Sequence, residues 1–311
     1  MRTDTISEVE PKRHSLLVDL VIRLVKEKPL GTVGGVIVLV MFLTGIFADV
    51  LAPYGMNEVH PADTLSPPSP QYMLGTDLLG RDILTRIIYG ARISMIVGLA
   101  GAALGTVVAI VIGVPCGFFG GKFDLTVQRL VDAFMCWPWL FFILTIMVMV
   151  GQGLPQVIFV LGIRGGIVNS RIVRSAVIGI KENVYVEATR AIGCPPWRIL
   201  TRHILPNIMA PIIIIFTLRV GQMILAEATI SFLGFGIPPP MPSWGGMLSG
   251  QGRRFMLMAP WLAIWSGLAL SIVVCGINML GDGVRDILDP RLKGGAGRYG
   301  RAKLKKNRKG R

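Results

Sequence analysis

The sequence predicts an all-α polytopic membrane protein. Of its 311 residues, 52 % are hydrophobic and only 16 % are charged, whereas a soluble domain carries roughly 25 % charged residues. The apolar residues also gather in long blocks, while a soluble core would spread them as amphipathic stripes. Each block is close to the ~20 residues that cross ~30 Å of hydrocarbon as a helix. The six predicted transmembrane helices are residues 30–51, 93–119, 134–150, 154–170, 208–234 and 261–280.

The distribution of basic residues predicts which side of the membrane each loop faces. Six spans place both termini on the same side. Of the 32 Lys and Arg residues, most lie in segments on that side. The opposite side holds only Arg81, Arg86, Arg253 and Arg254. Because cytoplasmic loops carry the excess of Lys and Arg, both termini are expected in the cytoplasm.

The segments that precede the membrane core differ in composition. Residues 1–29 are polar and basic and lack the apolar core and cleavage site of a removable signal, so we expect a retained cytoplasmic segment. Residues 52–92 begin with a proline-rich stretch that favours an extended extracytoplasmic arm. Thr76 or Asp77 is then expected to cap a helix that lies on the membrane surface. The predicted core is residues 93–281.

A basic tail, residues 282–311, contributes much of the net charge of +14. After Asp289 it contains ten Lys or Arg residues and no acidic residue. Nucleic-acid binding is one interpretation of such a tail. We favour attraction to anionic membrane lipid, because Tyr299 is the only aromatic residue of the tail that could stack on a base. A nucleic-acid partner is therefore not expected.

One polar stretch, residues 181–207, interrupts the apolar blocks. Glu182–Ile192 contains neither Pro nor Gly and is compatible with a short helix. Gly193 is a natural stop, since Gly takes left-handed backbone angles at no steric cost. The Pro195–Pro196 pair suits the first turn of a second helix, and Pro206 is expected to end it. The stretch therefore predicts two short helices joined by a rigid turn.

This polar stretch resembles the EAA loop of ABC importer permeases. The resemblance rests on Glu187-Ala188-Thr189, then Gly193, then Leu205-Pro206. Thr189 stands where the general pattern has Ala, and His203 stands where it has an apolar residue, as is typical of the peptide-transporter branch. The resemblance implies a coupling helix that sits in a groove of an ATPase subunit. The implied coupling residues are Glu187, Ala188, Thr189, Arg190, Ala191, Ile192, Gly193, Cys194, Pro195, Pro196, Trp197, Leu205 and Pro206.

Three further motifs, in order along the chain, resemble the C-type subunits of dipeptide, oligopeptide and nickel ABC importers. The first is Leu74-Gly75-Thr76-Asp77 followed by Gly80-Arg81-Asp82. The second begins at Ser231-Phe232-Leu233-Gly234 and ends at Ser243-Trp244-Gly245, and the third combines Gly281-Asp282-Gly283 with Asp289-Pro290-Arg291. One departure is Gly166, where relatives often carry Trp.

The resemblance has specific implications for fold and partners. It implies a type I (MetI-like) importer permease fold in a bacterial or archaeal cytoplasmic membrane. The expected partners are a homologous permease subunit, two ABC ATPases and an extracytoplasmic substrate-binding protein. ATP and Mg would be bound by the ATPases, and no cofactor by this chain. The cargo stays open among dipeptides, longer peptides, nickel complexes, glutathione and oligosaccharides.

Several polar residues lie within the predicted spans, where an ionisable group costs about 2.5–3.5 kcal/mol on insertion scales. They either line a translocation path or hold helices together, and the sequence favours neither interpretation. Glu227 lies eight residues beyond Arg219, about 80° further round the helix and ~12 Å along it, so the two cannot pair directly. Asp132 is expected to be structural. The candidates for a path are Arg164, Arg219, Gln222 and Glu227.

Small residues recur at the spacing that lets membrane helices approach closely. The pairs are Gly101 with Gly105, Gly113 with Gly117, and Gly162 with Gly166. We expect them to form packing seams.

No enzymatic or metal chemistry is predicted. The four cysteines have neither disulfide nor metal-ligand spacing, and the three histidines do not cluster. Gly120-Gly121-Lys122 lacks the remainder of a phosphate-binding loop. An alternative to the ABC permease is a secondary transporter or channel that works without nucleotide, but its typical inverted repeat is not evident. A membrane-embedded enzyme has no candidate catalytic residues to support it.

Overall fold

The computed structural model describes residues 16–288, so the predicted basic tail beyond Leu288 lies outside the described residues. Within this range the chain is helical, and its only extended pairing is a single bridge between Thr76 and Asp82. The helices are α1 (Leu16–Glu27), α2 (Pro29–Ile46), α3 (Ala48–Leu51), α4 (Ile83–Phe119), α5 (Gly121–Cys136), α6 (Trp139–Val150), α7 (Leu154–Lys181), α8 (Val184–Ala191), α9 (Pro196–Ile199), α10 (Met209–Phe232), α11 (Trp244–Leu248), α12 (Gly250–Arg254) and α13 (Trp261–Leu288). Three tighter or wider helical turns are η1 (Pro61–Asp63), η2 (Leu200–Ile204) and η3 (Leu205–Ile208).

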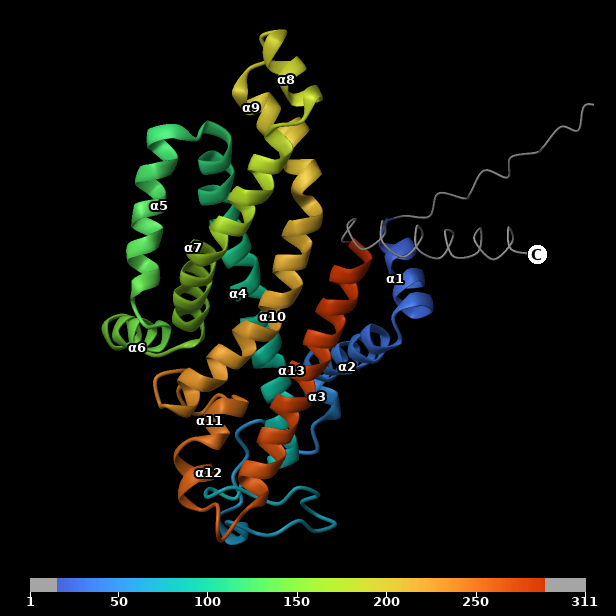
Figure 1. Ribbon diagram of the computed structural model, residues 1–311. Coiled ribbons are helices and arrows are strands. Elements are labelled where there is room, and N and C mark those ends of the chain that lie inside the picture. Colours follow the sequence, from blue (N-terminus) through green and yellow to red (C-terminus); the bar gives the residue numbers. More distant parts are fainter. Residues whose placement is uncertain (1–15, 289–311) are drawn as a thin grey trace, which may run out of the picture.

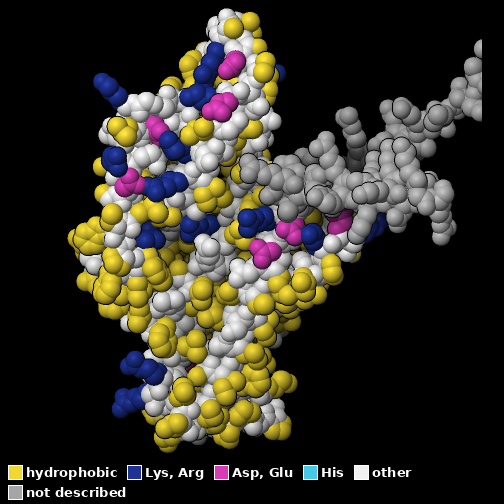
Figure 2. Space-filling view, in the orientation of Figure 1, with side chains coloured by type: hydrophobic (Ala, Val, Ile, Leu, Met, Phe, Trp, Pro, Cys, Tyr) yellow, Lys and Arg dark blue, Asp and Glu magenta, His cyan; other side chains and the backbone are white. Residues whose placement is uncertain are grey.

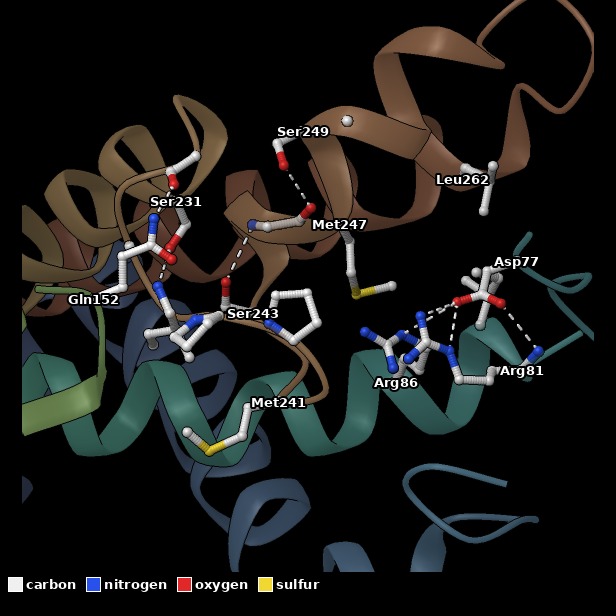
Figure 3. Close-up of a pocket in the computed structure, with 18 residues that line it drawn as sticks. Asp77, Arg81, Arg86, Gln152, Ser231, Met241, Ser243, Met247, Ser249 and Leu262 are labelled. Atoms are coloured by element: carbon white, nitrogen blue, oxygen red, sulfur yellow. Dashed lines mark hydrogen bonds and ion pairs between the residues drawn. The ribbon is translucent and has the colours of Figure 1, made fainter. Parts of the chain in front are cut away.

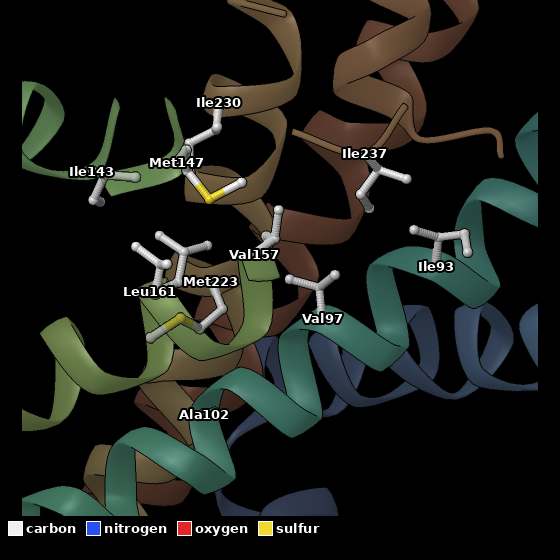
Figure 4. Close-up of a cluster of buried hydrophobic side chains, with 11 residues drawn as sticks. Ile93, Val97, Ala102, Ile143, Met147, Val157, Leu161, Met223, Ile230 and Ile237 are labelled. Carbon is white, nitrogen blue, oxygen red and sulfur yellow. The ribbon is translucent and has the colours of Figure 1, made fainter. Parts of the chain in front are cut away.

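The bundle is built around α4, which at 37 residues is about 55 Å long. It packs against α7, α10 and α2, and α13 packs in turn on α2 and α10 (Figure 1). A cluster of buried apolar side chains fills the space between α4, α6, α7 and α10 (Figure 4). Val97 of α4 and Val157 of α7 are fully buried there. This cluster fixes the relative positions of the helices that carry the polar candidates.

The glycine pairs form the expected seam between α4 and α7. A Cβ atom at Gly166 would lie 2.6 Å from the carbonyl oxygen of Gly105, and one at Gly105 would lie 3.1 Å from the carbonyl oxygen of Gly162. Gly101 faces a different helix, because its Cβ would meet Met223 of α10 at 3.3 Å. The absence of side chains at these positions is what allows the helix backbones to touch.

Between residues 16 and 288, five helices are long and apolar enough to cross a membrane, and a sixth span is present there if α5 and α6 are counted together. The third predicted span, residues 134–150, includes a bend, because α5 and α6 meet at 90°. Pro138 causes the break: Trp137 takes an extended conformation at φ −75° and ψ 130°, which a following proline favours over the helix. The third predicted span is therefore a bent pair that begins at Gly121.

The predicted surface helix capped by Thr76 or Asp77 is also corrected. The helix begins at Ile83 and runs without interruption into the membrane span as α4. Its cap is Asp82, whose carboxylate accepts a hydrogen bond from the Thr85 backbone N–H at 2.7 Å. The two residues expected to cap it lie in the preceding loop.

The described ends of the chain lie beside each other. Lys28, between α1 and α2, forms an ion pair of 2.5 Å with Asp286 near the end of α13. Other helix ends extend beyond the predicted spans, and α7 continues to Lys181. In this extension Arg174 donates a hydrogen bond of 2.6 Å from Nε to the Asp124 carboxylate. Most of the visible Lys and Arg side chains lie in the half of the molecule that carries α8 and α9 (Figure 2). The sequence signal for one basic side thus corresponds to one end of the bundle.

Candidate functional site

The predicted coupling residues lie in a loop that projects past the end of the bundle, and we call residues 182–208 the projecting loop (Figure 1). It contains α8 and α9 and returns through η2 and η3 into α10. The predicted first helix is present but shorter than expected, from Val184 to Ala191. Asp132, which was expected to be structural, lies outside the projecting loop. It is on α5 and is ion-paired with Arg171 of α7.

The inner side of the projecting loop is anchored to the bundle. Val186, Ile199 and Ile204 are at most 1 % exposed. They belong to one apolar cluster with Phe118 of α4 and Val177 of α7. Burial of apolar side chains on this scale holds the loop in one position relative to both membrane helices.

The outer side of the same loop exposes apolar side chains. Ile192 is 82 % exposed, Val184 80 %, Trp197 63 % and Tyr185 42 %. Glu187, the acidic residue of the EAA-like motif, is exposed beside them. Several large apolar side chains exposed on one anchored loop are typical of a surface that binds another protein.

The turn between α8 and α9 has the hydrogen bonds of a Schellman motif. The Gly193 N–H donates to the Arg190 carbonyl at 2.9 Å, and the Cys194 N–H donates to the Thr189 carbonyl at 3.0 Å. Gly193 has φ +76°, the left-handed conformation predicted for it. The Thr189 hydroxyl donates to the Val186 carbonyl at 2.7 Å, which satisfies this side chain where the family pattern has Ala.

Pro206 does not end the second helix, contrary to expectation. The chain continues from α9 through η2 and η3 into α10 as one helical path from Pro196 to Phe232. In η2 the Leu205 N–H donates to the carbonyl of Leu200, a five-residue separation that widens the helix. Such a widened turn accommodates a proline that cannot donate its own N–H. The projecting loop is therefore continuous with a membrane-spanning helix.

Three of the four polar candidates within the spans come together. Arg164 of α7 and Arg219 and Gln222 of α10 line one cavity of about 290 Å³ between α6, α7 and α10. Arg219 and Gln222 also line a second cavity of about 440 Å³ between α7, α10 and α13. Arg219 donates a hydrogen bond of 2.7 Å to the Asn169 side chain. The described residues that line the first cavity include two arginines and no acidic residue.

Glu227 lies apart from this group. Its side chain is fully buried and accepts a hydrogen bond of 2.6 Å from the Ser231 hydroxyl. Ser231 in turn accepts from the Ile237 backbone N–H at 3.2 Å. The carboxyl group thereby ties the end of α10 to the segment that follows it. The spacing of four residues between Glu227 and Ser231 could have indicated this contact.

A group of buried charges, absent from the predicted site residues, lies at the end of the molecule opposite the projecting loop. Asp77, Arg81 and Arg86 all line a cavity of about 220 Å³ there (Figure 3). Asp77 and Arg81 form a buried ion pair of 2.6 Å. The signal was present, since all three lie in or just after the first motif shared with peptide permeases. Among residues 16–288, no group of three or more His, Cys, Asp or Glu side chains could hold a metal ion.

Comparison with known proteins identifies the family. The family model described as "Binding-protein-dependent transport system inner membrane component" matches residues 105–294. Residues 15–68 match the "N-terminal TM domain of oligopeptide transport permease C". The dipeptide transport system permease protein DppC of Alkalihalophilus pseudofirmus is 37 % identical over 93 % of both chains. The glutathione transport system permease protein GsiD of Pectobacterium atrosepticum is 36 % identical over 84 % of this chain and 86 % of its own.

A solved structure shows the same fold. The match is to a chain of the MetNI methionine ABC transporter in an inward-facing conformation. The TM-score is 0.54 at 19 % identity, and the match covers 66 % of this chain and 96 % of that one. The predicted MetI-like fold is thereby confirmed.

Fold and comparisons together define a class, the multi-pass inner-membrane permease subunits of ABC importers. Within that class, the chain belongs to the binding-protein-dependent transport family, in its peptide-importer branch.

Proposed function

We propose that this chain forms half of the translocation path of an ATP-driven peptide importer and is coupled to an ATPase through the projecting loop. The observation that carries the proposal is the contrast between the two sides of that loop. Its inner side is buried against α4 and α7, and its outer side exposes Ile192 at 82 % and Trp197 at 63 %. An exposed apolar surface of this kind is stabilised when a partner covers it.

The projecting loop is mechanically suited to transmit movement. Its helical path leads into α10, so a displacement of α9 by a partner moves the same helix that carries Arg219 and Gln222. The cluster around Phe118 links the loop to α4 and α7 as well. Closure of an ATPase pair would therefore change the spacing of the helices around both polar cavities. Arg164, Arg219 and Gln222 are proposed to line the path that opens and closes.

The proposed assembly contains a second, homologous permease subunit, two ABC ATPases and an extracytoplasmic substrate-binding protein. ATP and Mg are bound by the ATPases, so this chain hydrolyses nothing itself. The end with the projecting loop faces the cytoplasm, because most basic residues of the sequence lie in segments on that side. Small peptides are the proposed cargo, since the named relatives are permeases for dipeptides and glutathione.

The coupling role is tested by placing a charge on the outer side of the loop. Ile192→Asp and Trp197→Asp should reduce co-purification of the ATPase and peptide uptake, because each buries a carboxylate in an apolar contact. Glu187→Lys should do the same by reversing a charge. Leu257→Asp is the matched control, because Leu257 is 97 % exposed and lies outside the loop. Normal ATPase binding and uptake in all three loop variants would refute the proposal, and uptake without any ATPase would favour a nucleotide-independent transporter.

A further inference from the structure

The cavity opposite the projecting loop contains an unmatched positive charge. It lies between the start of α4, the segment that follows α10 and the start of α13. Under the proposed orientation this end faces the extracytoplasmic side. Figure 3 shows Asp77, Arg81 and Arg86 turned toward one another at one side of the cavity and the serines at the other.

The carboxylate of Asp77 is already fully engaged. Arg81 donates to it from Nε at 2.8 Å and forms an ion pair with it through Nη2 at 2.6 Å. The backbone N–H groups of Leu79 and Arg81 donate to its second oxygen at 2.8 and 3.1 Å. One carboxylate is thus matched to one guanidinium, and no capacity is left for a second close pair.

Arg86 is the more weakly paired of the two cations. Its side chain is only 8 % exposed, and its Nε lies 3.8 Å from the nearest oxygen of Asp77. Its Nη1 is buried and has no hydrogen-bond partner among the described residues. Burial of a guanidinium N–H without an acceptor is costly, so this group is expected to have a partner that the isolated chain does not supply.

The other polar groups of the cavity are occupied within the protein. The Gln152 side chain donates to the Gly234 carbonyl at 2.7 Å, and Ser243 accepts from the Gly246 N–H at 3.1 Å. Ser231 is bound to Glu227, and Ser249 donates to the Gly246 carbonyl at 3.0 Å. Much of the remaining wall is apolar: Ile83, Ile237, Pro238, Met241, Met247 and Leu262. A ligand that fits has one anionic group beside an apolar body.

Size limits the ligand further. At about 220 Å³ the cavity is smaller than the ~300–1,000 Å³ of typical small-molecule pockets. It holds the volume of about seven water molecules, enough for the end of a peptide. A carboxylate is the natural acceptor for a guanidinium, and the pair forms charge-assisted hydrogen bonds.

We propose that this cavity is a carboxylate subsite that receives the C-terminal carboxyl group and last apolar side chain of a peptide, with Arg86 as the binding group. The choice of a peptide as ligand rests on the proposed function. Recognition of a carboxylate does not rest on the proposed function, because it follows from the unmatched guanidinium alone.

The direct test measures peptide binding to the full permease–ATPase complex in nanodiscs, without nucleotide and without binding protein. The probes are alanyl-leucine and its C-terminal amide, compared by calorimetric titration. The free acid should bind about tenfold more tightly than the amide, since a hydrogen bond to a charged group is worth at least this factor. Arg86→Lys should keep this preference and Arg86→Gln should abolish it. Arg253→Gln is the control, because Arg253 is exposed and does not line the cavity.

Equal binding of acid and amide by the wild-type complex would overturn the proposal, as would an unchanged preference in Arg86→Gln. If that variant fails to assemble, Met241→Trp, which fills the cavity from its wall, must weaken binding of the acid for the proposal to stand. Docking of ligand-free binding protein is measured in parallel. If Arg86→Gln weakens docking while the acid binds normally, the carboxylate belongs to the binding protein and the peptide subsite is refuted. These readouts need no ATP hydrolysis, so a complex that binds its ATPase but does not couple hydrolysis to uptake would give the same result.

Discussion

Replacing Gly193 by valine should uncouple ATP hydrolysis from uptake while leaving insertion intact. Gly193 has φ +76°, and a Cβ built on it would meet no atom within 4 Å. The cost of a side chain is therefore conformational and not steric. A left-handed conformation costs an L-residue roughly 1–2 kcal/mol, and a β-branched residue is among the least tolerant of it.

This strain acts on the geometry between α8 and α9. A cost of about 1–2 kcal/mol lowers the population of the native turn, relative to alternatives, by about 5- to 30-fold. If the turn rearranges, the two hydrogen bonds that Gly193 and Cys194 donate are lost as well. The anchored residues Val186 and Ile199 lie on either side, so the membrane helices keep their packing while the exposed surface changes shape.

The assay compares peptide-stimulated ATP hydrolysis with peptide uptake in proteoliposomes that contain the whole transporter. Gly193→Asn is the matched variant, because Asn tolerates the left-handed region far better than Val or Ala. Uptake per ATP should fall in the order Gly, Asn, Ala, Val at equal amounts of inserted protein. Wild-type coupling in Gly193→Val, or equal damage by Asn and Val, would refute the backbone argument.

Three further predictions concern stability. Asp77→Asn should destabilise the assembled protein by about 3–5 kcal/mol, because the buried guanidinium of Arg81 loses its ion-pair partner. Asp49→Asn breaks an exposed pair with Arg92 and should cost much less, and thermal unfolding in detergent compares the two variants. Gly166→Leu should prevent α4–α7 packing and lower the amount of folded protein, while Gly179→Leu on the same helix should not, because a Cβ there meets nothing within 4 Å. Burial and the neighbouring Asp63 raise the pKa of Tyr72 to about 12, above the usual ~10. Between these two pH values only the unfolded chain loses the tyrosine proton, so the extracytoplasmic arm should lose stability as pH rises through that window. Tyr72→Phe should remove this step from an alkaline unfolding curve.

Local sequence patterns were sufficient to predict much of the fold and the turn at Gly193. A span needs about 20 apolar residues in sequence, so five spans could be found from composition alone. The turn at Gly193 could equally be predicted from the sequence, because the ability to adopt the left-handed conformation belongs to glycine itself. By contrast, the bend at Pro138 and the passage through Pro206 were misjudged. Both prolines disturb a helix, but the surrounding packing decides whether the chain breaks or widens by one residue.

The sequence by itself determined the class of protein, the approximate spans and the place of the EAA-like motif, because these depend on neighbours along the chain. Only the tertiary structure decided which polar groups meet. Arg164 and Arg219 share a cavity because α7 and α10 pack around one apolar cluster. Nη1 of Arg86 lacks an acceptor in a cavity where Arg81 already occupies the carboxylate of Asp77. Ion pairs form between side chains that are close in space, and spacing along the sequence does not show which partner is already paired.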